Sequence, residues 1–254
     1  MRRPQWDRRL TREHGRLVAL QMLCHELLSY VRVELANRYL PVKHKCPCCG
    51  WEGNRFHDYF EVVRTHTNVE CPQCASHPRH RALFLWMHAE NKLANWRGIG
   101  LVFAPEAAFA SAWASSHRLH VFGIDVRARR NVNLQADLCN LPVANNSIDL
   151  QWCHHVLEHI KNDRDAIKEL YRILRPVSGE LILSVPMRTG VRTLEYGFSN
   201  TRESGHWRVY GDDFVDTVAA CGFHIEPLTY DLSPQDRELY GLIQERYYIC
   251  TKPE

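Results

Sequence analysis

The chain begins with a long helical pattern of apolar positions. Within residues 11–37 the apolar side chains recur every three or four residues, which places them on one face of a helix. These residues are Leu17, Leu20, Cys24, Leu28, Val31 and Leu35. We expect this stripe to pack on the chain's own core, with pairing of two chains into a homodimer as the alternative. Pro41 ends the pattern because proline cannot continue a helix.

From residue 98 onward, short apolar runs alternate with amphipathic segments. Strands are expected at 101–104, 121–126, 147–153, 180–186, 223–230 and 245–251, and helices at 107–115, 165–174 and 212–221. Gly98 and Gly100 mark a break before the first strand, and residues 187–211 read as a long loop. This alternation predicts an α/β fold, with a doubly wound, Rossmann-like and mostly parallel sheet covered on both faces.

The composition fits a globular protein and excludes a disordered chain, since 45% of the 254 residues are hydrophobic and 24% are charged. Met1 is not followed by an apolar signal segment, and residues 17–35 carry too many polar groups for a membrane span. We therefore expect a cytoplasmic protein with reduced thiols. Its ten cysteines then require an explanation other than disulfides.

Four cysteines form two pairs with the spacing of a zinc site. Cys46 and Cys49 make the first CxxC pair, and Cys71 and Cys74 make the second after 21 intervening residues. Four thiolates at this spacing are typical of structural, tetrahedral Zn²⁺. Cys48 is the spare thiol. Few aliphatic residues lie within 41–80, so this segment needs such a metal for its stability.

These patterns divide the chain into an N-terminal helical segment (1–40), a zinc-ribbon module with a linking helix at 80–96 (41–97), and an α/β domain (98–254). Residues 1–97 carry 16 Lys and Arg against 9 Asp and Glu, whereas the remainder is acidic. A basic front half could bind nucleic acid, but the excess is modest, and a solvated surface is the favoured interpretation.

The α/β half contains several motifs in a characteristic order. Asp125 ends the second strand, and Asp137-Leu138 follows twelve residues later. Then come His155-Val-Leu-Glu-His159 ("HVLEH") and a Leu174-Arg-Pro-Val-Ser-Gly179 turn. The order and spacing resemble class I S-adenosylmethionine (SAM)-dependent methyltransferases of the small-molecule type. The whole chain is similar to bacterial methyltransferases that combine CPxCG and CPxC knuckles with "RHR" (79–81), "APE" (104–106) and "HxRxYG" (206–211) segments.

This resemblance implies a set of residues that bind SAM. Asp125 and Val126 would meet the ribose, Asp137 and the backbone of Leu138 the adenine, and His154 and His155 would edge the methyl-transfer pocket. Ala104, Pro105 and Glu106 replace the family's glycine-rich first loop, and Glu106 could face the SAM ammonium group. The missing glycines keep open the alternative of a non-catalytic binding protein with a degenerate SAM site.

Methyl transfer to oxygen or nitrogen usually needs a general base, for which histidine is suited. The candidates are His155, His159 and His206. If residues 155–159 are helical, His155 and His159 share a face and Glu158 is turned aside. The expected acceptor is a small molecule or a carrier-linked, sugar-related compound, and Arg188, Arg192, Arg202 and Arg208 could hold an anionic one. RNA, docked on the basic zinc module, is the alternative acceptor.

Overall fold

The computed structural model describes residues 15–60, 65–229 and 232–254 and divides the chain into two compact units. One unit comprises Met1–Trp86, Ala107–Ser111 and Asp231–Ile243, and the other comprises Met87–Glu106, Ala112–Tyr230 and Gln244–Glu254. Residues 11–14 of the first expected helix, and position 230 of the fifth expected strand, lie outside the described residues.

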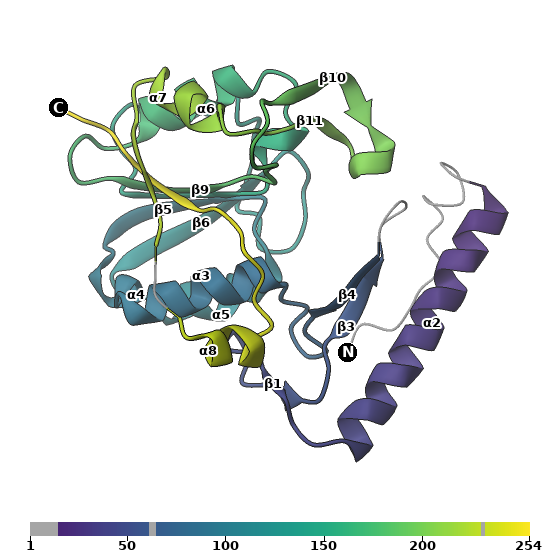
Figure 1. Ribbon diagram of the computed structural model, residues 1–254. Helices are drawn as coiled ribbons and strands as arrows, with labels where there is room; N and C mark the ends of the chain where they lie inside the picture. Colours follow the sequence, from purple (N-terminus) through teal and green to yellow (C-terminus); the bar gives the residue numbers. More distant parts are fainter. Residues whose placement is uncertain (1–14, 61–64, 230–231) are drawn as a thin grey trace. The chain divides into compact units, whose positions relative to one another are not determined.

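The larger unit contains a seven-stranded sheet in the order β12-β13-β9-β8-β5-β6-β7. Figure 1 labels β5, β6 and β9 of this sheet and shows α6 and α7 on one side of it. Its strands are β5 (Gly98–Phe103), β6 (Leu119–Asp125), β7 (Leu134–Gln135), β8 (Leu150–His154), β9 (Glu180–Ser184), β12 (His224–Pro227) and β13 (Tyr248–Thr251). All neighbours pair in parallel except β13, which runs antiparallel to both β9 and β12. The predicted α/β fold with a mostly parallel sheet is thus confirmed.

Each face of this sheet carries its own apolar layer. On one side, α6 (Asp163–Ile173) and α7 (Phe214–Ala219) supply Ile167, Leu170 and Phe214, all fully buried, to a cluster that includes Cys153 of β8. On the other side, Trp152 of β8 meets Trp113 of α5 (Ala110–Ser115), with ring centroids 5.1 Å apart. Strand alternation explains this division, because successive side chains of β8 point to opposite faces.

Two details of the sequence interpretation are wrong. Gly98 and Gly100 do not break the chain; they are the first and third residues of β5. A side chain at Gly98 would overlap the carboxyl group of Asp149, so glycine is required inside the strand rather than before it. The expected loop 187–211 contains the antiparallel hairpin β10 (Leu194–Asn200) and β11 (His206–Val209), whose irregular register hides the two-residue alternation.

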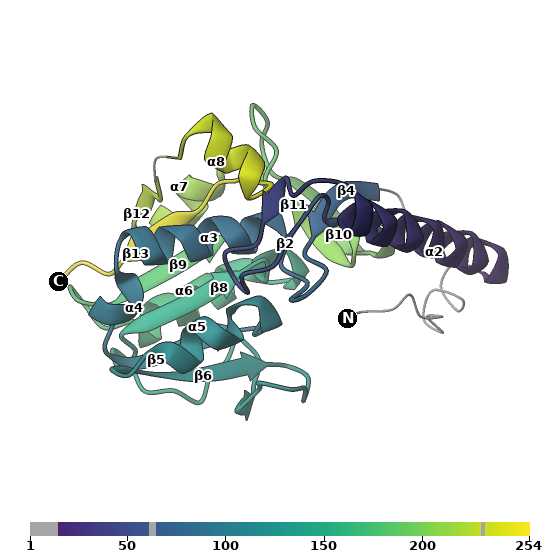
Figure 2. The same cartoon turned by 90° about the horizontal axis from the view of Figure 1, so that it is seen from below.

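The smaller unit contains one long helix, α2, and several shorter elements. They are α2 (Arg16–Tyr39), β1 (His44–Lys45), β2 (Glu52–Gly53), β3 (His57–Phe60), β4 (Thr65–Glu70), the first part of α3 (Pro78–Ala89), the 3₁₀ turn η1 (Ala107–Phe109) and α8 (Pro234–Leu239). The expected helix 80–96 is two helices, α3 and α4 (Lys92–Asn95), because Asn91 adopts a left-handed φ of 49° between them. Figure 2 shows α2 as a long helix, which has 24 residues.

The expected packing of α2 is also wrong. Its apolar stripe is exposed, with Leu17 70% and Leu28 71% accessible, whereas Ser29 and Val33 on another face are buried. The buried face is anchored by a polar contact, because the Ser29 hydroxyl donates to the Asp58 carboxylate at 2.7 Å. Asp58 is nearly inaccessible and also pairs with Arg55. The spacing of apolar residues therefore predicted the helix but not the face that packs. Self-association through the exposed stripe stays a prediction.

No helix among the described residues is both long enough and apolar enough to cross a membrane.

We predict that Asp149→Ala destabilises the sheet unit. Asp149 accepts a hydrogen bond from the Ile99 amide at 2.8 Å and pairs with the Arg175 guanidinium at 2.8 Å, at the amino-terminal edge of the sheet. The loss should lower the free energy of unfolding by about 1–3 kcal/mol in urea titrations. The control Asp165→Ala, at an exposed helix position, should change it by less than about 0.5 kcal/mol. Equal stability of both variants would contradict this assignment.

Candidate functional site

The carboxyl ends of β5, β6 and β8 meet at one edge of the sheet. Strand β5 pairs with β6 on one side and with β8 on the other, so the connections that leave β5 and β8 depart in opposite directions. Such a switch point is where open α/β sheets bind ligands. All residues that the sequence assigned to SAM lie at or just beyond the carboxyl ends of β5, β6, β7 and β8.

The loop after β5 keeps the backbone shape of a glycine turn without containing glycine. Ala104 has a φ of 48°, a left-handed conformation that is uncommon for residues with a side chain. Its amide donates to the Ile124 carbonyl of β6 at 2.8 Å, which holds the loop against the neighbouring strand. Glycine at position 123 lets Asn131 and Pro105 pack closely there, since a Cβ atom would overlap the Asn131 carbonyl and press on Pro105. The alanine-containing loop therefore still provides a close backbone approach.

Asp125 is the last residue of β6 and is only 7% exposed. One carboxylate oxygen accepts a hydrogen bond from the Arg127 amide at 2.9 Å, and the other forms an ion pair with Arg129. The carboxylate is therefore fixed in direction. It faces the Arg129 guanidinium, whose side chain is half exposed. Val126, the next residue, is 58% exposed beside it.

Asp137 and Leu138 follow the short edge strand β7. The Asp137 carboxylate accepts from the Cys139 amide at 2.9 Å and so folds the turn on itself. Asp137 is exposed, whereas Leu138 is buried in the apolar layer beneath α6. This pair thus offers an exposed carboxylate at the same end of the sheet as Asp125, next to a residue anchored in the core.

His154 ends β8 and is 4% exposed. Its Nδ1 atom hydrogen-bonds the Ser184 hydroxyl of the adjacent strand β9. Its Nε2 atom lies 3.9 Å from the carboxylate of Glu106, which follows the β5 loop. The ring of His154 is thus held between the two sides of the switch point.

The HVLEH segment is not the helix that would align His155 with His159. His155 has a φ of 52°, and only Leu157–His159 form a 3₁₀ turn, η2. Glu158 is not turned aside: it is 1% exposed, and its carboxylate lies 3.6 Å from Nδ1 of His155. A left-handed non-glycine residue at the end of a strand carries backbone strain of a kind found at functional sites.

His159 instead meets His206, with ring centroids 4.7 Å apart in an edge-to-face arrangement. Desolvation by the surrounding chain lowers the pKa of His159, although a hydrogen bond to the backbone of Gly205 opposes this shift. The two rings come from different elements: His159 is the last residue of η2, and His206 is the first residue of β11.

Arg208 fixes the hairpin against η2 and is not available for an anionic acceptor. It is 3% exposed and donates to the carbonyls of Ile160 at 2.5 Å and Lys161 at 2.7 Å. Its Nε atom also pairs with Glu195 of β10. The sequence alone did not separate this arginine from its solvated neighbours, because a structural role shows only in burial.

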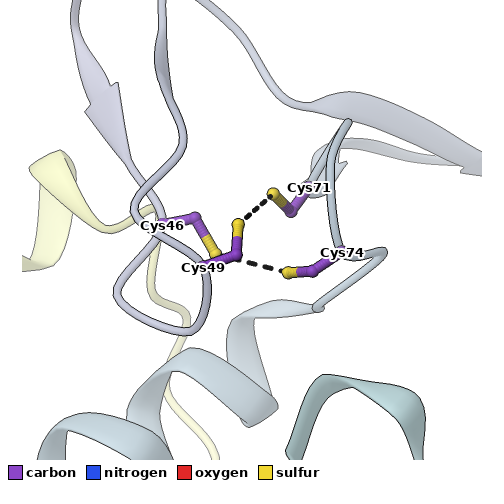
Figure 3. Close-up of side chains that lie close together, drawn as sticks. All are labelled: Cys46, Cys49, Cys71 and Cys74. Carbon is purple, nitrogen blue, oxygen red and sulfur yellow. Dashed lines mark hydrogen bonds between the residues drawn. The ribbon is translucent and has the colours of Figure 1, made fainter. Parts of the chain in front are cut away.

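In the smaller unit the two cysteine pairs converge (Figure 3). The sulfur atoms of Cys46 and Cys74 are 3.6 Å apart, and those of Cys49 and Cys71 are also 3.6 Å apart. None of the ten cysteines forms a disulfide. Hydrogen bonds from neighbouring thiols lower the pKa of Cys46, and burial raises the pKa of Cys49 to about 12. A tetrahedral Zn²⁺ with bonds of about 2.3 Å would separate its sulfurs by about 3.8 Å, so the four thiols fit that ion.

Both cysteine pairs adopt the same turn. The Gly50 amide donates to the Cys46 carbonyl at 2.9 Å, and the Ala75 amide donates to the Cys71 carbonyl at 2.9 Å. Gly50 and Ala75, which each follow the second cysteine of a pair, have φ angles of 75° and 57°. The two pairs are therefore matching knuckles, of which only the first uses glycine at the left-handed position.

Arg81 lies at the centre of this unit and is fully buried. Its guanidinium donates to four carbonyls, of Val69, Ser76, Tyr240 and Gly241, at 2.6–3.0 Å. It also lies over the Phe56 ring, 4.0 Å from the centroid. Burial lowers its pKa, and the charges of nearby cysteines, Cys46, Cys48, Cys71 and Cys74, oppose that effect. The sequence offered one signal for this residue, the RHR segment, but no role.

No curated protein matches the chain. Among solved structures, YcgJ from Bacillus subtilis is similar at 14% identity over 67% of this chain and 99% of that chain, with a TM-score of 0.47. A chain of the Haloferax volcanii complex between the Trm112 methyltransferase activator and the protein assigned as its methyltransferase is similar at 14% identity, over 69% and 93%, with a TM-score of 0.46.

A phosphoethanolamine N-methyltransferase of Haemonchus contortus, solved with S-adenosylhomocysteine, is similar at 14% identity over 67% of this chain and 52% of that chain, with a TM-score of 0.44. The family model described as "Methyltransferase domain" matches residues 104–183. This segment runs from the loop after β5 through the first four residues of β9. The part of the chain that forms the switch point is thus matched by a methyltransferase-domain family.

Proposed function

We propose that the protein is a SAM-dependent methyltransferase. The observation that carries this proposal is the family match to residues 104–183, whose strands end in a buried, directionally fixed carboxylate at Asp125. An acid at this position of a doubly wound sheet is suited to accept hydrogen bonds from the two ribose hydroxyls of a nucleoside.

The remaining residues at this edge fit the other parts of SAM. The left-handed Ala104 backbone provides a close approach for the methionine part, and Glu106 provides an anion for its ammonium group. The Asp137 carboxylate is exposed and would meet the adenine together with the backbone of Leu138, whose side chain is buried beneath α6. Val126 would cover the ribose edge. Ion pairing of Arg129 with Asp125 must give way when the ribose binds.

SAM supplies a methyl group on a positively charged sulfur. The chain's task is to place an acceptor oxygen or nitrogen in line with that methyl group and to remove its proton. We propose His155 as the base, since the buried Glu158 carboxylate faces its Nδ1 atom and can hold the ring and stabilise its protonated form. His154 is the positioning neighbour, fixed by Ser184. A small-molecule or carrier-linked acceptor remains our proposal.

We predict that Asp125→Ala abolishes SAM binding. Removing the ribose acceptor should weaken the affinity at least a hundredfold in calorimetric titrations, because hydrogen bonds to a charged acceptor are worth about 1.5–3 kcal/mol each. Asp149→Ala, at the opposite edge of the sheet, is the matched control and should bind SAM within about threefold of the wild type at a temperature where it is folded. No binding by the wild type at millimolar SAM would instead favour a non-catalytic binding protein.

We also propose that Cys46, Cys49, Cys71 and Cys74 hold one structural zinc ion in the 41–97 module. The sulfur separations support four ligands and no open position. A Zn²⁺ ion with four thiolates carries a net charge of −2, and the buried Arg81 guanidinium partly compensates it. The Ser76 hydroxyl lies 3.1 Å from the Cys46 sulfur and is a further neighbour of the ion.

We predict one zinc ion per chain by elemental analysis of the purified protein. The double variant Cys46→Ser, Cys71→Ser should lose that zinc, because hydroxyls replace two thiolate ligands. Cys48→Ser is the control: this thiol is the spare in the first pair, and its variant should retain the zinc. Loss of zinc from the Cys48 variant alone would show that the ligand set is different.

A further inference from the structure

We propose that Glu158, His159 and His206 form a second metal site, for a divalent transition-metal ion, at the carboxyl end of β8. One ligand atom of each residue lies within 4.8 Å of the other two. The site is distinct from the cysteine site in position and chemistry, since it offers two imidazoles and a carboxylate. Binding of the ion does not depend on the proposed function, whereas the role of the ion in methyl transfer rests on it.

The separation of the three groups is close to what a bound ion requires. Bonds of about 2.0–2.2 Å to nitrogen and oxygen place neighbouring ligand atoms about 3–3.5 Å apart. The observed separations between ligand atoms are at most 4.8 Å. Shifts of about 1 Å or less in each side chain would shorten them to the separations around a bound ion. Glu158 is buried, His206 is half-buried and His159 is exposed, so the cluster reaches from the interior to the solvent. An ion can enter from that side and keep open coordination positions.

The backbone around the cluster is already fixed. His206 and Arg208 are two residues apart on β11 and so point to the same face of the strand. Because Arg208 binds the carbonyls of Ile160 and Lys161, the face that carries His206 is held against η2. The His159 and His206 rings already lie edge to face, with their centroids 4.7 Å apart.

The donor set selects the kind of ion. Two imidazoles with one carboxylate suit zinc, cobalt, nickel, iron or manganese, whereas calcium and magnesium prefer sites made of oxygen atoms alone. Three protein ligands leave at least one position for water or for an oxygen of the acceptor. The ion would lower the pKa of a bound hydroxyl, so this site favours alcohol or phenol acceptors.

The transfer then balances without any further reactant. The acceptor hydroxyl gives its proton to the neighbouring base His155, and its oxygen forms a bond to the methyl carbon. The carbon–sulfur bond breaks, and its electron pair stays on sulfur, which becomes a neutral thioether. The ion holds the oxygen throughout and is not consumed.

The test is a calorimetric titration of the full chain with Co²⁺, after dialysis against a weak chelator that leaves zinc on the four cysteines. Thiolates hold Zn²⁺ more tightly than Co²⁺, so the added cobalt reports on the second site. We expect one Co²⁺ per chain. His206→Ala and Glu158→Gln should each weaken binding at least tenfold. His224→Ala, which removes an exposed histidine on β12, is the control and should leave binding unchanged.

Zinc content and absorption spectra are measured on the same samples. Retained zinc in every variant shows that the fold and the cysteine site are intact, and intense cobalt–thiolate absorption would reveal cobalt in the wrong site. No Co²⁺ binding by the wild type at millimolar concentration, or equal affinity in His206→Ala, overturns the proposal. SAM titrations separate the two claims: SAM binding without cobalt binding overturns only the metal site, and cobalt binding without SAM binding overturns only the methyltransferase.

Discussion

The pairing of β5 with both β6 and β8 is the constraint on which the rest of the larger unit depends. Parallel pairing brings the carboxyl ends of these strands to one edge, and the opposite directions of the following connections leave space between them. Asp125, His154 and the Ala104 loop come from distant parts of the sequence, yet each lies at that edge because each follows one of these strands. The chemistry proposed for the protein therefore depends on the strand order, which brings these residues together.

In each unit, one buried arginine binds several backbone carbonyl groups. Arg81 binds carbonyls from three separate segments of the smaller unit, and Arg208 binds carbonyls of η2 while its own strand pairs with β10. Irregular backbone leaves carbonyl groups without ladder partners, and one guanidinium with five donors can satisfy several of them at once. Each arginine thereby fixes the residues beside it: the cysteine knuckles near Arg81, and the Glu158, His159 and His206 cluster near Arg208.

The sequence predicted what depends on local periodicity and motif spacing. The parallel sheet, the presence of a long helix at α2, and the cysteine pairs all follow from patterns that a short window contains. It could not predict which face of α2 packs, because the polar Ser29–Asp58 contact outweighs the apolar stripe there. It also mistook the conformation of residues 155–159, since the left-handed His155 and the burial of Glu158 depend on β9 and β11. The β10–β11 hairpin escaped notice because its register shifts between Glu195 and Asn200.

A structure of the chain with S-adenosylhomocysteine bound would test the central claim, that the switch point is a SAM site, most directly. The account predicts the ribose hydroxyls on the Asp125 carboxylate, with Arg129 displaced, the adenine beside Asp137 and the Leu138 backbone, and the sulfur near the carboxyl end of β8. A ligand bound elsewhere, or an Asp125–Arg129 pair that persists beside a bound ligand, would contradict it.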